Sequence, residues 1–296
     1  MAASVMSAGE RALLPTPEQV AEYEAHGWWI SPPCIGEEAL EELRFGIERY
    51  YSGERDWRLP IVSASDWTPA DGDVVRQNDF ASLQLEEFRA FLLRQPVIAA
   101  MAARLARSPS VRLFHDQIVY KPAGRSLQET GVGWHTDRSY WRTCTSARML
   151  TAWIPLADVD ERSGTMTVID GSHLWPDAEK LRRFHERDVD AVQREITPSG
   201  AWIEVPYRMR AGQVAFHHCR TIHGSRQNMS DVPRIAWAVH FQDEDNRWQP
   251  ATNPDGTMTP HMNDLLCRKT PDGTPDYRDP DVCPELWREE PYEPFI

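Results

Sequence analysis

A histidine and an aspartate stand two residues apart in the segment Trp134-His135-Thr136-Asp137. Because side chains alternate along a β-strand, His135 and Asp137 point to the same side and can bind one metal ion. A third ligand must come from another strand, and His223 is best placed, because it follows a strand-like segment and precedes a glycine that lets a cofactor approach the backbone. Two histidines and one carboxylate form the facial triad that holds iron(II) in non-haem oxygenases.

Other histidines near His223 are alternative ligands. His217, His218 and His240 lie in the same part of the chain. The first two adjoin an apolar segment, so we expect one of them to be buried and hydrogen-bonded rather than a fourth ligand. A His-x-Asp triplet also arises by chance as a surface pair, so the residues that follow must decide between the two interpretations.

An arginine and a serine downstream of His223 favour the metal site. Arg234 begins a β-like segment, and Ser225 lies two residues after the histidine. A guanidinium group binds carboxylates through paired hydrogen bonds, and a nearby hydroxyl can donate another. An iron site beside such an anchor indicates an enzyme that uses the keto diacid 2-oxoglutarate. The alternative role for Arg234 is an ion pair with Asp231.

The elements that must position these residues change in kind along the chain. Helical patterns come first, and alternating apolar segments bounded by glycine and proline follow. This order predicts helices around a β-sandwich or barrel. We expect one domain over 1–296, with a helical leader at 16–110, a β core at 111–243 that carries a helical insertion at 175–196, and a coil-rich C-terminal wrap at 244–296. The expected helices are 17–25, 36–47, 83–93 and 96–106, and the expected strands are 28–30, 111–120, 147–155, 165–169, 202–205, 213–217 and 235–241.

The composition excludes several classes of protein. Lysine plus arginine is 32 and aspartate plus glutamate is 45, so the net charge of −13 disfavours nucleic acid and anionic membranes as partners. No apolar run is long enough to span a membrane, and the first residues do not resemble a secretion signal. Five cysteines without a CxxC pair argue against a disulfide framework or structural zinc. We therefore expect a cytoplasmic protein.

Several motifs, in this order and spacing, resemble the phytanoyl-CoA dioxygenase family of iron(II)- and 2-oxoglutarate-dependent oxygenases. They are His135-x-Asp137, 151–160, 164–173, 212–216, His223-Gly-Ser225 and Arg234, within a stretch at 111–243. The resemblance implies a double-stranded β-helix, a jelly-roll and cupin-like core, with iron at one mouth. It further implies His135, Asp137 and His223 as metal ligands, Arg234 and Ser225 on the C5 carboxylate of 2-oxoglutarate, and Trp153 and Gln117 as walls of that pocket.

The same resemblance implies a dioxygenase that uses Fe(II), 2-oxoglutarate and O2 to hydroxylate a C–H bond of a small organic metabolite, releasing succinate and CO2. Asp137 stands where related halogenases have glycine or alanine, so we expect a hydroxylase. The breadth of the family points to secondary-metabolite biosynthesis. Two alternatives are a zinc or manganese hydrolase or isomerase on the same barrel, and a non-catalytic binding barrel. The Arg234 anchor argues against the first alternative and the intact triad against the second.

Aromatic residues near the metal ligands are the candidates for substrate contact. Trp134 and Trp141 flank the triplet, and Trp67 lies in a long loop at 52–78 that we expect to act as a lid. The acidic chain disfavours the phosphates of a CoA thioester, so we expect a small hydrophobic or amphipathic substrate. Lys121 ends the strand at 111–120, and we expect it at a solvated edge.

Overall fold

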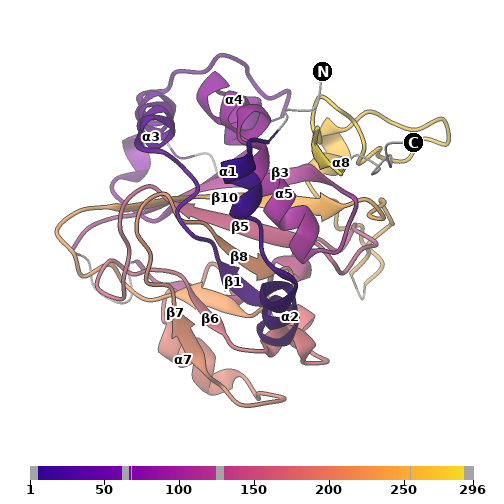
Figure 1. Ribbon diagram of the computed structural model, residues 1–296. Helices are drawn as coiled ribbons and strands as arrows, with labels where there is room; N and C mark the ends of the chain where they lie inside the picture. Colours follow the sequence, from indigo (N-terminus) through magenta and orange to yellow (C-terminus); the bar gives the residue numbers. More distant parts are fainter. Residues whose placement is uncertain (1–5, 62–66, 68, 125–129, 254, 290–296) are drawn as a thin grey trace.

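The computed structural model describes residues 6–61, 67, 69–124, 130–253 and 255–289. Two antiparallel sheets form its centre, and helices from the first part of the chain cover the larger one (Figure 1). Together the sheets form a double-stranded β-helix, so the mainly β architecture with N-terminal helices is confirmed. Within the described ranges, no helix is both long enough and apolar enough to cross a membrane.

The larger sheet has seven strands, in the order β1-β8-β5-β10-β3-β11 with β2 also paired to β3. Its strands are β1 (Trp28–Ile30), β2 (Arg76–Asp79), β3 (Ser110–Lys121), β5 (Leu150–Pro155), β8 (Ala215–His218), β10 (Arg234–Asp243) and β11 (Glu285–Arg288). The smaller sheet has the order β4-β9-β6-β7. Its strands are β4 (Val132–His135), β6 (Thr167–Ile169), β7 (Glu204–Pro206) and β9 (His223–Ser225). The sequence did not predict β2, β9 and β11, because β2 and β9 contain no apolar side chain and β11 lies in the C-terminal segment rich in proline and aspartate.

The helices are α1 (Ala8–Ala12), α2 (Pro17–His26), α3 (Glu37–Ser52), α4 (Glu86–Arg94), α5 (Pro96–Leu105), α7 (Val189–Glu195) and α8 (Asn263–Leu266). Helix α2 shows how local chemistry sets these bounds. The Thr16 side chain accepts from the Gln19 backbone N–H, and the Gln19 side chain accepts in return from the Thr16 backbone N–H. The helix ends at Gly27, which has a φ of 80°.

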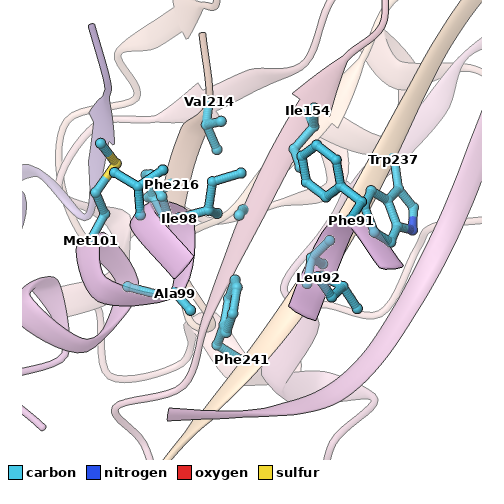
Figure 2. Close-up of a cluster of buried hydrophobic side chains, with 14 of the residues drawn as sticks. Phe91, Leu92, Ile98, Ala99, Met101, Ile154, Val214, Phe216, Trp237 and Phe241 are labelled. Carbon is cyan, nitrogen blue, oxygen red and sulfur yellow. The ribbon is translucent and has the colours of Figure 1, made fainter. Parts of the chain in front are cut away.

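Helices α4 and α5 bury the outer face of the larger sheet, as Figure 2 shows. The rings of Phe88 and Phe91 meet the indole of Trp237 on β10 edge-on, with centroids 5.0 Å and 5.6 Å away. Because side chains alternate along β10, this packing turns Arg234 and His240 toward the opposite face, between the two sheets. The hydrophobic core thus fixes which side chains of β10 reach the site.

Two segments expected to be irregular pair with the free edge of β3. Residues 76–79, which overlap the last three residues of the expected loop 52–78, form β2 opposite residues 117–120 of β3. Residues 62–66 and 68 of that loop lie outside the described residues. Within the C-terminal wrap, β11 pairs with residues 110–112 of β3. Strand β10 pairs with only one edge of β3. Strands β2 and β11 supply hydrogen-bond partners for the backbone groups on the other edge of β3.

Two expectations about the remaining segments are corrected. The insertion at 175–196 is helical only at α7 and in a short 3-10 turn at Ala178–Lys180. An ordered wrap should bury its apolar residues against the barrel, but Leu265 is 62% exposed, whereas its neighbour Leu266 packs against a cluster around Phe114 and Trp141. A single helical turn presents only one of two adjacent leucines to the core.

Candidate active site

The ends of two paired strands bring the three predicted metal ligands together. His135 is the last residue of β4 and His223 the first of β9, and the register places them opposite each other. Asp137 follows β4 in a 3-10 turn, and its Oδ1 lies 3.6 Å from His223 Nε2. One ligand atom from each residue lies within 4.8 Å of the others, and all three residues are buried. This donor set fits a divalent metal with open coordination positions.

Both histidines are held in the form that binds metal. His135 Nδ1 lies 2.8 Å from the Gly133 carbonyl oxygen, and His223 Nδ1 lies 2.9 Å from that of Thr221. A carbonyl only accepts, so each Nδ1 carries the hydrogen and each Nε2 offers its lone pair. Burial lowers the pKa of His135 to about 4 and that of His223 well below its ordinary value, so both rings are neutral.

Two further residues orient the carboxylate of Asp137. Thr151 donates its hydroxyl to Asp137 Oδ2 at 2.6 Å, and His217 Nε2 donates to the same oxygen at 3.1 Å. Thr151 and His217 are opposite each other in the β5–β8 pairing, so the larger sheet supplies both donors. His217 is the buried, hydrogen-bonded histidine that the sequence predicts. Thr151 was missed, because a threonine within an apolar strand shows no sign of its partner.

Arg234, at the start of β10, is a buried cation that has no carboxylate within ion-pair distance in the part of the chain that the structure describes. Its Nη2 donates to the Gly164 carbonyl at 3.3 Å, while Nε and Nη1 have no hydrogen-bond partner among the described residues. The guanidinium lies 5.5 Å from the ring of Trp153, and burial lowers the pKa of Arg234 to about 10. Asp231, the alternative partner, is exposed and pairs with Arg162. A carboxylate ligand would fit the two free nitrogens.

The structure corrects the prediction for Lys121, which is fully buried rather than at a solvated edge. Its Nζ donates to the hydroxyl of Ser225 at 2.7 Å and to the Arg226 carbonyl. Lys121 is opposite Arg234 in the β3–β10 pairing, and it is four residues after Gln117 on the same face of β3. Burial, with Arg234 nearby, lowers the pKa of Lys121 well below its ordinary value.

Two cavities meet at the ligands. A narrow cavity of about 50 Å³ lies between the sheets and is lined by the three ligands, Arg234, Ser225, Trp153 and Gln117. A wide cavity of about 640 Å³ is lined by His135, Asp137, Gln117, Trp67 and Trp141, among others. Gln117 stands at the junction, where it donates to Asp79 at 2.8 Å. The geometry separates a small pocket that contains Arg234 from a much larger one, with the candidate metal position between them.

Of the three tryptophans expected to contact the substrate, the structure places two at the wide cavity and one elsewhere. Trp141 and Trp67 line the wide cavity. Trp134 does not line either cavity: it is fully buried on the other face of β4 and packs against Trp202, with ring centroids 5.2 Å apart. Adjacent strand residues face opposite sides, so a side chain next to His135 cannot share its cavity.

Comparison with known proteins agrees with this geometry. The sequence pattern of the phytanoyl-CoA dioxygenase (PhyH) family matches residues 23–236. Peroxisomal phytanoyl-CoA dioxygenase of Mus musculus is 25% identical over 78% of this chain and 69% of its own length. Ectoine dioxygenase of Bordetella parapertussis is 24% identical over 79% of this chain and 77% of its own length.

A solved structure extends the similarity to nearly the whole chain. The non-haem α-ketoglutarate-dependent carbocyclase SnoK from nogalamycin biosynthesis has a TM-score of 0.67 and 25% identity, covering 91% of this chain and 96% of its own. The family pattern, which spans most of the chain, establishes the relationship. This chain belongs to the phytanoyl-CoA dioxygenase family of iron(II)- and 2-oxoglutarate-dependent oxygenases.

Proposed function

We propose that this chain is a hydroxylase that oxidises a C–H bond of a small organic metabolite. His135, Asp137 and His223 are the proposed iron ligands. Arg234 and Ser225 are the proposed partners of the C5 carboxylate of 2-oxoglutarate, with Trp153 and Gln117 as walls of its pocket. When bound, the iron couples the oxidative decarboxylation of 2-oxoglutarate to succinate and CO2 with oxidation of the substrate by O2.

The observation that carries this proposal is the buried Arg234 at the end of a narrow cavity that also contains the metal ligands. An unpaired buried charge is costly, and a carboxylate ligand would compensate it. A zinc or manganese hydrolase needs no such anchor. A binding barrel would not need two neutral histidines that turn Nε2 toward one carboxylate.

The protein's own residues prepare the pocket before any ligand arrives. Thr151 and His217 hold one oxygen of Asp137, which leaves Oδ1 on the side of His223. Lys121 donates to Ser225 and so fixes the hydroxyl beside Arg234. These contacts reduce the reorganisation that binding would otherwise require.

Calorimetry without O2 tests the proposal. Mn(II) serves as a redox-inactive stand-in for iron, and 2-oxoglutarate is compared with glutarate, which lacks the keto group. We expect 2-oxoglutarate to bind far more tightly with Mn(II) than without it, and more tightly than glutarate. Aerobic protein with Fe(II) should then release succinate when the right metabolite is supplied. Metal-loaded protein that does not bind 2-oxoglutarate would overturn the proposal.

We also propose a setting for this activity. The five cysteines are all free thiols, which supports the reducing cytoplasm as its location. The similarity to SnoK, an enzyme of nogalamycin biosynthesis, supports a role in secondary-metabolite biosynthesis.

A further inference from the structure

The wide cavity is lined by three arginines as well as by the carboxylates of Asp71, Asp79 and Asp137. Its volume of about 640 Å³ is within the range of pockets for drug-sized ligands. Arg76, Arg182 and Arg187 all line it. Arg76 is already satisfied, because its guanidinium lies 3.3 Å from Asp73 and is stacked on the ring of Trp67. The other two arginines differ from it.

Arg182 and Arg187 are fixed in place by contacts that leave their charge free. Arg182 forms a backbone bridge with His135, which places it beside a proposed metal ligand, and its guanidinium lies 4.6 Å from the ring of Tyr140. Arg187 donates from Nη1 to the Gly131 carbonyl at 3.0 Å. Burial lowers the pKa of Arg187 from its ordinary value, which is the mark of a desolvated cation.

The acidic side chains of the same segment are all engaged elsewhere. Asp188 accepts from the Ala191 backbone at the start of α7. The others form ion pairs: Asp177 with Lys180, Glu179 with Arg138, Glu186 and Glu195 with Arg183, and Asp190 with Arg226. Across the described ranges, no carboxylate comes within ion-pair distance of Arg182 or Arg187. A ligand is therefore the natural source of a counter-charge.

Aromatic rings form another part of the wall of the wide cavity. Trp141, Tyr140 and Phe184 line the cavity together with the imidazole of His261. Burial lowers the pKa of His261 to about 3, so this ring is neutral and offers a stacking surface rather than another cation. The carboxylate of Asp79 on the same wall is paired with His115 at 3.2 Å. The cavity thus combines rings on its walls with two free guanidinium groups on one side.

We propose that the wide cavity binds a ring-bearing organic acid whose carboxylate or phosphate pairs with Arg182 and Arg187. The inference rests on the proposed function, because it takes this cavity as the substrate site of the oxygenase. It narrows the expectation of a small hydrophobic or amphipathic substrate to one that carries an acidic group. The net charge of −13 describes the whole surface, whereas the charge that selects the ligand is local.

Three matched probes test the inference on the full chain loaded with Mn(II) and 2-oxoglutarate: 2-naphthoate, 2-naphthyl phosphate and 2-naphthamide. We expect at least one anionic probe to bind at least tenfold more tightly than the neutral amide. Arg182→Gln and Arg187→Gln should each weaken binding of that anion about tenfold, the loss of one charge-assisted hydrogen bond, without changing the affinity for the amide.

Arg183→Gln is the matched control. Arg183 is adjacent to Arg182 but is paired with Glu186 and Glu195, so its loss should leave probe affinity unchanged. Arg187→Lys keeps the charge and should recover most of the affinity lost in Arg187→Gln, which separates charge from folding. Preference for the carboxylate or the phosphate identifies the anion.

The outcomes distinguish the two proposals. Equal affinity for all three probes, or no binding of any, overturns the substrate inference while bound 2-oxoglutarate leaves the proposed function standing. Failure of the wild-type protein to bind 2-oxoglutarate overturns the proposed function itself. Loss of anion affinity in Arg183→Gln equal to that in Arg182→Gln would also count against a specific site.

Discussion

The two cavities that meet at the proposed metal position are built in different ways. The narrow cavity takes Arg234 and Ser225 from strands and Asp137 from the turn directly after β4, and all three are buried. The wide cavity takes Trp67 and Arg182 from segments outside the strands, and both side chains are partly or largely exposed. Strand register thus fixes the chemistry, while the connecting segments are free to define the substrate.

The contrast also concerns charge. The narrow cavity is lined by the buried Arg234, and the buried Lys121 lies opposite it on β3, where its Nζ donates to Ser225. In the wide cavity, the two arginines that have no ion-pair partner among the described residues belong to the segment between β6 and β7. The strand residues of the narrow cavity suit a single diacid, 2-oxoglutarate. The arginines of the wide cavity can be replaced without disturbing either sheet. If this division is right, substitutions in the two cavities will affect different measurements.

The largest effect is expected where the cavities meet. His223→Ala removes one of three proposed ligands, so metal content should fall far below one ion per chain and turnover should drop by at least about a thousandfold. Elemental analysis and succinate release measure the two effects. His26→Ala, an exposed histidine paired with Asp170 on the surface, is the control and should behave as wild type. Full metal content and activity in His223→Ala would refute the assignment.

The next effect belongs to the narrow cavity. Arg234→Ala should weaken 2-oxoglutarate binding by hundreds-fold, because breaking a buried ion pair on one side costs about 3–5 kcal/mol. Metal binding should stay unchanged. Calorimetry with Mn(II) measures both affinities, and Arg162→Ala, an exposed arginine, is the control. An unchanged 2-oxoglutarate affinity would contradict the proposed anchor.

A smaller effect is expected from the residues behind the ligands. Thr151→Val keeps the shape of the side chain and removes the hydrogen bond to Asp137. Loss of such an orienting contact typically weakens metal binding by about 10–100-fold. A Mn(II) titration should show this loss, and Thr151→Ser should restore most of the affinity. Equal metal affinity in all three proteins would mean that His217 alone orients the carboxylate.

The narrow cavity also predicts a pH dependence. Burial depresses the pKa of Lys121 in the free protein, whereas a bound diacid favours the ammonium form and raises it. Binding then takes up a proton, so 2-oxoglutarate affinity should fall as pH rises between those two pKa values, by up to about tenfold per pH unit. Calorimetry in buffers of different ionisation enthalpy measures the proton uptake. Lys121→Met should abolish it, and wild-type binding without proton uptake would exclude this role for Lys121.

The sequence predicted the narrow cavity better than the wide one, for physical reasons. Long strands can be predicted from the alternation of apolar and polar residues. The motif around His223 also predicted that Arg234 belongs to the same cavity, and both residues line it. Lys121 was misplaced because lysine is rarely buried, although its even spacing from Gln117 already put both on one face. Trp134 was misplaced because adjacent residues of a strand face opposite sides, and this rule was not applied to Trp134 and His135.

The wide cavity was harder to predict because its residues come from several segments that show no common helical or strand spacing in the sequence. Arg182 and Arg187 lie in an irregular segment where a helix was expected. Which of its arginines remain unpaired depends on partners far away in sequence, such as Arg226 for Asp190. Such pairings emerge only once the chain has folded, so composition, which disfavoured the phosphates of a CoA thioester, could not reveal these arginines.

The smallest effect is expected at the rim of the wide cavity, where the proposed lid residue Trp67 lies. Its indole donates to the Gly72 carbonyl at 2.9 Å and its ring lies edge-on against Tyr51, so the side chain is held over the cavity rather than free in solvent. Trp67→Ala should therefore open the cavity to water without touching the metal ligands. We expect a few-fold lower ratio of substrate oxidised to 2-oxoglutarate consumed, with 2-oxoglutarate affinity unchanged. Trp57→Ala, an exposed tryptophan that lines neither cavity, is the control. If Trp67→Ala instead weakened 2-oxoglutarate binding, the two cavities would not be separable as proposed. If it changed neither the coupling ratio nor the 2-oxoglutarate affinity, Trp67 would be a surface feature. The substrate would then be selected by the side of the cavity that carries Arg182 and Arg187.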